Sequence, residues 1–127
     1  MKRIILYTGL FLMAAWGISG CYKDVILPET VADPDGPPQS VSFTTQLVPI
    51  LSSKCAISGC HVSGGHKPYL SSDISYKELM NGGFVNTIIP KESIIYKEIN
   101  GDMQTNIPSA IDRQLIYDWI RNGAPNN

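Results

Sequence analysis

Two cysteines and a histidine constrain this chain more than any other feature of its sequence. Cys55 and Cys60 are separated by four residues, and His61 follows directly. A Cys-x-x-Cys-His run is the attachment signature of c-type haem: each thiol forms a thioether and the histidine lies beneath the iron. The loop here is two residues longer, and Gly59 gives its backbone the freedom to bulge while both sulfurs still reach. The motif therefore predicts one covalent haem c, with His61 as the proximal iron ligand.

Two other uses fit the same side chains. Cys55 and Cys60 could form a disulfide that closes a small loop, because nearby thiols seldom stay free in an oxidising compartment. A zinc ion bound by the two cysteines, His61 and His66 is the second alternative. Neither alternative requires a histidine directly after the second cysteine, so haem attachment is the preferred interpretation.

Residues 1–20 have the pattern of an export signal peptide. A charged start at Lys2 and Arg3 precedes an almost unbroken apolar run, and small residues follow at Ser19 and Gly20. A bilayer-spanning helix needs about 20 apolar residues, and this run is shorter. An uncleaved anchor helix is therefore the less favoured alternative.

The end of this signal, Ile18-Ser19-Gly20-Cys21, resembles the lipobox of bacterial lipoproteins. The resemblance implies that Cys21 becomes the new N-terminus and carries several acyl chains, which would hold the protein on a membrane. We therefore expect an exported protein that is lipid-anchored to a bacterial membrane, the outer membrane, on its periplasmic or surface face. This use of Cys21 leaves Cys55 and Cys60 as a pair.

Two regions follow the predicted signal. Residues 21–40 comprise the lipidated N-terminus and a tether rich in proline and acidic side chains, a composition that favours an extended chain over a packed element. Residues 41–127 form one small domain, whose core is marginal without a cofactor or crosslink. The domain contains seven basic and seven acidic side chains. It therefore lacks the basic face that a nucleic-acid binder needs.

Hydrophobic spacing predicts an all-α domain of three to four short helices. The first includes Phe43 and Leu51, and Pro49 either kinks it or confines the regular helix to one side. The second is capped by Ser72 or Asp73 and continues through Met80, which reads as a core residue.

Two more helices are expected nearer the C-terminus. One begins at Pro90 and ends before Gly101, and the segment ahead of it, residues 84–89, is a candidate short extended stretch. The last helix starts with a Ser109–Asp112 capping box. Its apolar stripe consists of Ile111, Leu115, Ile116, Trp119 and Ile120. We expect Trp119 to anchor the crossing of the first and last helices, with Phe43 as its partner.

The domain resembles the small cytochrome c domains of bacterial outer-membrane lipoproteins and planctomycete-type cytochromes. The resemblance covers nearly all of residues 41–126. It rests on Phe43, Val48-Pro49-Ile50-Leu51, Cys55, Cys60-His61, Leu70, Tyr76, Pro90-x-x-Ser93-x-x-Tyr96, Met103 and Trp119-Ile120-x-x-Gly123-Ala124.

The resemblance implies a cytochrome c-like fold, in which the first and last helices cross around a covalently bound haem. A loop ahead of the last helix would bring a methionine to the open side of the iron. That methionine is Met103, which would be the distal ligand. Two alternatives stay open: Met103 as an ordinary surface or packing residue, and His66 as a rival distal ligand.

A haem with both axial positions filled has no place for a substrate, so the sequence predicts a single-electron carrier with a weakly bound redox protein partner, rather than an enzyme. Two alternatives remain. Without Met103 on the iron, an open site would make a gas sensor or a peroxidase-like protein. Without haem, the chain would be a disulfide-containing lipoprotein that acts as a binding module.

Overall fold

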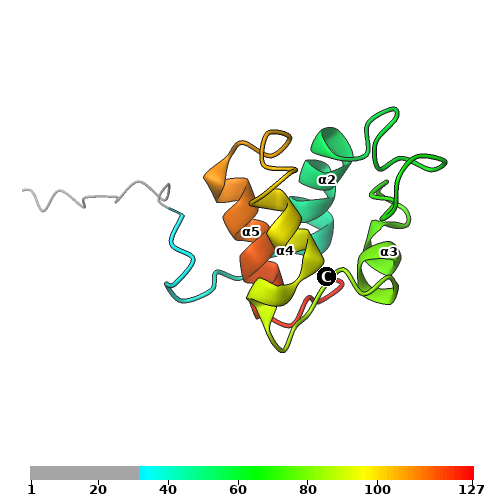
Figure 1. Ribbon diagram of the computed structural model, residues 1–127. Helices are drawn as coiled ribbons and strands as arrows, with labels where there is room; N and C mark the ends of the chain where they lie inside the picture. Colours follow the sequence, from blue (N-terminus) through cyan, green and yellow to red (C-terminus); the bar gives the residue numbers. More distant parts are fainter. Residues whose placement is uncertain (1–31) are drawn as a thin grey trace, which may run out of the picture.

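The computed structural model describes residues 32–127, and these residues are helical with no strand among them (Figure 1). The all-α prediction is confirmed for this part of the chain. The elements are the π-helical turn η2 (Phe43–Leu47), α2 (Val48–Lys54), α3 (Ser75–Asn81), the 3-10 turn η3 (Pro90–Glu92), α4 (Ile94–Ile99) and α5 (Ala110–Arg121). The predicted signal peptide and Cys21 lie outside the described residues. Within 32–127, no helix is long and apolar enough to cross a bilayer.

Pro49 shapes the first helical segment by lacking a backbone N–H. It lies in the first turn of α2, where proline is tolerated. The turn before it is wider, and the Val48 N–H donates to the carbonyl of Phe43, five residues earlier. The regular helix is thus confined to the C-terminal side, where Leu51 is buried and Cys55 follows the last turn.

An aromatic cluster forms the core where the first helical segment meets α5. The rings of Phe43 and Trp119 have centroids 5.1 Å apart, and the rings of Phe43 and Tyr76 meet edge to face with centroids 5.2 Å apart. The indole N–H of Trp119 donates to the carbonyl of Pro125 over 2.8 Å, so the buried polar atom of the largest core side chain is satisfied. The predicted partnership of Phe43 and Trp119 is confirmed.

Helix α5 begins as predicted, but its buried face is different from the predicted stripe. Ser109 Oγ accepts a hydrogen bond from the Asp112 N–H over 3.1 Å, the expected N-cap. Ile111, placed in the apolar stripe, is 37% exposed. Asp118 is buried instead, because its carboxylate accepts hydrogen bonds from Gln114 (2.8 Å) and Arg121 (2.7 Å). A paired carboxylate therefore takes a place that hydrophobic spacing alone assigns to solvent.

The middle helices differ from the predicted boundaries. Neither Ser72 nor Asp73 caps α3, whose first N–H, on Ser75, donates to the carbonyl of Ser71. The helix predicted from Pro90 is divided at Ser93, because the Ser93 hydroxyl turns inward and bonds to the backbone of Asn86. Met80 packs against the core as predicted.

The last residues of the predicted tether are held against α5. Arg121 donates to the carbonyl of Gly36 over 2.7 Å, and the Gln39 N–H donates to the buried carboxylate of Asp118 over 3.2 Å. Asp35 pairs with Lys91 over 3.1 Å. Residues 35–39 are therefore part of the domain surface, although their composition predicts an unpacked chain.

Candidate functional site

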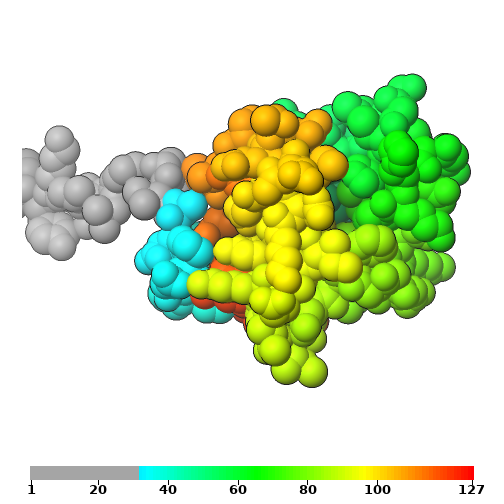
Figure 2. Space-filling view, in the orientation of Figure 1, coloured from blue at the N-terminus to red at the C-terminus, as the bar shows by residue number. Residues whose placement is uncertain are grey.

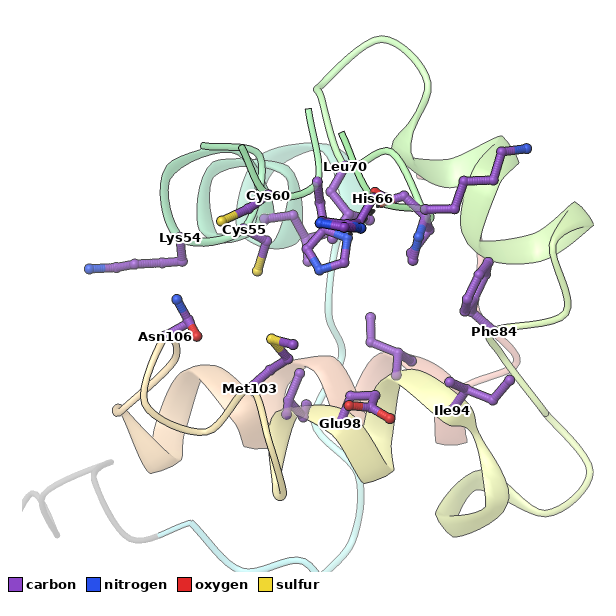
Figure 3. Close-up of a pocket in the computed structure, with 16 residues that line it drawn as sticks. Lys54, Cys55, Cys60, His66, Leu70, Phe84, Ile94, Glu98, Met103 and Asn106 are labelled. Carbon is purple, nitrogen blue, oxygen red and sulfur yellow. Dashed lines mark hydrogen bonds between the residues drawn. The ribbon is translucent and has the colours of Figure 1, made fainter. Parts of the chain in front are cut away.

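A cavity of about 550 Å³ separates two walls of the molecule (Figure 3). One wall is the end of α2 with the loop at residues 55–70, and the other is α4 with the loop at residues 101–108. The lining is mainly apolar and includes Leu51, Leu70, Phe84, Ile95 and Ile99. Its volume lies within the range of roughly 300–1,000 Å³ that is typical of cofactor and small-molecule sites.

The cysteine motif forms the upper wall in Figure 3. Cys55 follows α2 directly, and its thiol points into the gap between the walls. The four residues between the cysteines bulge outward, which leaves Ile57 43% exposed, while the His61 N–H returns to the carbonyl of Cys55 over 3.1 Å. Gly59 has a φ of 81°, a left-handed conformation that glycine adopts without strain. The longer loop therefore keeps both cysteines and His61 on one cavity wall.

The imidazole of His61 has a defined tautomer. Its Nδ1 lies 3.0 Å from the carbonyl oxygen of Pro68 and 3.2 Å from that of His66. Carbonyl oxygens only accept hydrogen bonds, so in the neutral imidazole Nδ1 carries the proton and Nε2 keeps its lone pair. Histidines that bind metals commonly donate their second nitrogen to a carbonyl in this way. The His61 side chain lines the cavity, and its Nε2 is the ring nitrogen that could bind a metal.

Burial raises the pKa of the Cys55 thiol from 9.0 to about 11, and the neighbouring Cys60 adds to the shift. The thiol of Cys55 therefore stays protonated at neutral pH. Because the thiolate is the form that attacks disulfides, this environment slows oxidation of Cys55. Both cysteines are free thiols in the structure.

Met103 lies on the opposite wall, and its sulfur points into the cavity towards the cysteine side (Figure 3). Its backbone N–H donates to the carbonyl of Glu98 over 2.8 Å, which ties the loop to the end of α4. Ile107, fully buried, secures the other end of the loop. The guanidinium of Arg113 on α5 donates to the carbonyls of Ile107 (2.6 Å) and Pro108 (2.8 Å). Hydrogen bonds therefore hold the loop that carries Met103 at both ends.

The zinc alternative requires Cys55, Cys60, His61 and His66 to converge on one point. Zinc sites in proteins use three or four converging side chains. Among residues 32–127, no three His, Cys, Asp or Glu side chains lie close enough together to hold a metal. His66 lines the same cavity and is exposed, and its backbone carbonyl faces His61.

Two supporting residues of this site were missed from the sequence. Pro68 orients His61 through its carbonyl, and a backbone acceptor seven residues away has no sequence signature. Arg113 has a weak signal, a basic residue in the first turn of a helix, where the helix dipole disfavours positive charge. Its bonds to the preceding loop account for that position.

Comparisons of this chain with models of known protein families, with curated proteins and with solved structures found no match.

Proposed function

We propose that this protein is an exported, lipid-anchored c-type cytochrome that carries single electrons through one covalently attached haem. The observation that carries the proposal is the convergence of Met103 on the cavity that Cys55 and His61 line from the other side. Met103 follows His61 by 42 residues in the sequence. A thiol pair, an imidazole and a thioether around one apolar cavity are the donor set of a His/Met-ligated haem c.

The residues present fit such a group. Cys55 and Cys60 would hold it as thioethers, and the Nε2 lone pair of His61 would bind the iron from the cysteine side. The Met103 sulfur would bind from the facing wall as a soft, neutral ligand that favours ferrous iron. The apolar lining would keep water away from the ligands. When bound, the haem supplies reversible one-electron redox chemistry.

The ligand set favours a carrier over an enzyme. With His61 and Met103 both bound, the protein would offer no coordination position to a substrate. Exchange of an electron then requires a redox protein partner at the exposed edge of the cavity, and such encounters are characteristically weak and small. Acyl chains on Cys21 would keep that exchange at a bacterial membrane.

Haem staining of the denatured chain tests this proposal. The full chain is produced in a host with a c-type haem attachment system, and the polypeptide band is stained for haem after denaturing electrophoresis. Thioether-linked haem survives denaturation, so the native chain stains and a Cys55→Ser/Cys60→Ser variant of equal abundance does not. An unstained native band in which Cys55 and Cys60 are oxidised to a disulfide would support the binding-module alternative.

A second candidate function follows from the position of Met103, whose side chain is 38% exposed. If this methionine leaves the iron, the open position would suit a small-gas sensor or a peroxidase-like protein. Carbon monoxide distinguishes the two functions. The reduced spectrum of a His/Met carrier stays unchanged on mixing, whereas an open site changes at once.

A further inference from the structure

Two isoleucines project from the molecule next to the cavity. The loop at residues 86–90 forms the lower end of the view in Figures 1 and 2, and its Ile88 and Ile89 side chains are 90% and 55% exposed. Ile94, which follows at the start of α4 and lines the cavity, is 46% exposed. Large exposed apolar side chains close together in the sequence are candidates for an interaction surface. These three residues are here termed the apolar tip.

The loop holds the apolar tip in a fixed conformation. The side-chain oxygen of Asn86 accepts hydrogen bonds from the N–H groups of Ile88 (3.0 Å) and Ile89 (2.9 Å). The hydroxyl of Ser93, which is 1% exposed, accepts from the Asn86 N–H over 2.9 Å and donates to the Asn86 carbonyl. A hydrogen-bonded turn therefore presents the two isoleucines to solvent.

The described start of the chain lies against the loop that carries Ile88 and Ile89. Lys91, two residues after Ile89, pairs with Asp35 over 3.1 Å. Arg121 donates to the carbonyls of Pro34 and Gly36 and holds the chain beside α5. Cys21 precedes Asp35 by 14 residues, which span at most about 50 Å when fully extended. A membrane that holds Cys21 therefore lies within reach of the apolar tip.

We propose that the apolar tip docks into the bilayer that carries the acyl chains of Cys21, with Ile88 and Ile89 inserted at the headgroup boundary. The inference rests on the proposed lipid attachment, and it adds a fixed orientation of the domain on the membrane. The nearby lysines are already paired, Lys91 with Asp35 and Lys97 with Glu92. Docking is therefore apolar and takes place equally well on zwitterionic and anionic bilayers.

Fluorescence quenching by brominated lipid tests this proposal. The full acylated chain is placed in phosphatidylcholine vesicles with or without bromine on the acyl chains, and a reporter tryptophan is introduced at the exposed Thr87. Trp119 is fully buried and gives the same background in every variant. The ratio of emission between the two kinds of vesicle cancels quenching by groups within the protein. Gln104→Trp, in the loop at the opposite end of Figure 1, is the matched control.

The expected result is that emission from Thr87→Trp falls by roughly half in brominated vesicles, since interfacial insertion reaches the acyl boundary. Emission from Gln104→Trp stays unchanged, and the additional substitutions Ile88→Ser and Ile89→Ser abolish quenching at position 87. Equal quenching at the two positions, or quenching that survives the serine substitutions, overturns the proposal.

The test separates failure of docking from failure of the anchor. An acylated chain that floats with the vesicles and shows no quenching at position 87 leaves the apolar tip to a protein partner and refutes membrane docking. A chain without acyl groups, judged by mass spectrometry, refutes both the anchor and the docking that rests on it. Haem staining of the same sample is independent of either result.

Discussion

The two walls of the cavity are built by different means. The cysteine wall is local: Cys55, Cys60 and His61 lie within seven residues, and the bond from His61 to the Pro68 carbonyl orients the ring. The methionine wall is assembled from a distance, because Arg113 on α5 fastens the loop that carries Met103. In the proposed cytochrome, the cysteine wall would determine whether the haem is held, and the methionine wall would determine its electronic properties.

The largest expected effect is on the cysteine wall. His61→Ala removes the Nε2 donor, so we expect loss of the low-spin visible spectrum and little mature haem protein. His66→Ala is the matched control, because it removes the other imidazole of the cavity and keeps the backbone carbonyl that faces His61. Absorption spectra of the two purified variants measure the effect. Equal spectra for the two variants would mean that His61 has no special role.

A substitution on the methionine wall is expected to have a smaller effect. Met103→Leu keeps the size of the side chain and removes the sulfur, so haem stays attached and its reduction potential falls by on the order of 100 mV. Met80→Leu, at a partly buried position packed against the core, leaves the potential unchanged. Potentiometric titration followed in the visible spectrum gives both values. A Met103→Leu protein with native potential would exclude Met103 as the distal ligand.

The thiol of Cys55 provides a test on the haem-free chain. Its raised pKa of about 11 lowers the thiolate fraction at pH 8. The lower thiolate fraction slows alkylation, and the greater nucleophilicity of a more basic thiolate offsets part of this effect. Alkylation in the folded chain should therefore be roughly ten- to a hundredfold slower than in urea. Peptide mass spectrometry after timed exposure to iodoacetamide gives the rate at Cys55. Similar rates in the two states would show that the thiol is not shielded.

The raised pKa of Cys55 also makes the stability of the haem-free chain depend on pH. The folded pKa of Cys55 lies above its ordinary value of 9.0, so the folded chain retains a proton that the unfolded chain releases. The stabilising contribution is complete below pH 9 and is lost as the pH rises to about 11. The free energy of unfolding of the haem-free chain should fall across this window. A Cys55→Ala chain, which lacks the thiol, should show a smaller decline.

The smallest expected effect concerns the fastening of the methionine loop. Arg113→Met removes two hydrogen bonds from a charged donor to the carbonyls of Ile107 and Pro108, with an expected loss of about 1–3 kcal/mol in the free energy of unfolding. Urea denaturation measures the loss. Because the loop loosens, carbon monoxide should also bind the reduced haem protein faster in this variant. A variant with native stability and native carbon monoxide kinetics would contradict the assigned role of Arg113.

The elements predicted correctly depend on neighbours in the sequence. The Ser109 cap, the position of Pro49 and the backbone freedom used at Gly59 each follow from a few adjacent residues. The Phe43–Trp119 contact is long-range, but large aromatic side chains on two apolar helical faces are buried most readily against each other.

The features that sequence reasoning missed depend on tertiary partners. Ser93 divides a predicted helix because its hydroxyl finds the backbone of Asn86, and hydrophobic spacing contains no information about that bond. Residues 35–39 are polar and proline-rich, yet Arg121 and Asp118 bind their backbone. For the site, Cys55, Cys60 and His61 are visible as a motif, whereas the supports from Pro68 and Arg113 emerge only in three dimensions.

Peptide mass spectrometry of the matured native chain tests the central claim most directly. After proteolysis, the peptide that contains residues 55–61 should carry one porphyrin linked through both cysteine sulfurs. The same peptide from the His66→Ala variant should carry it as well. Recovery of the native peptide from a haem-attaching host with two free thiols, or with a Cys55–Cys60 disulfide, would contradict the account.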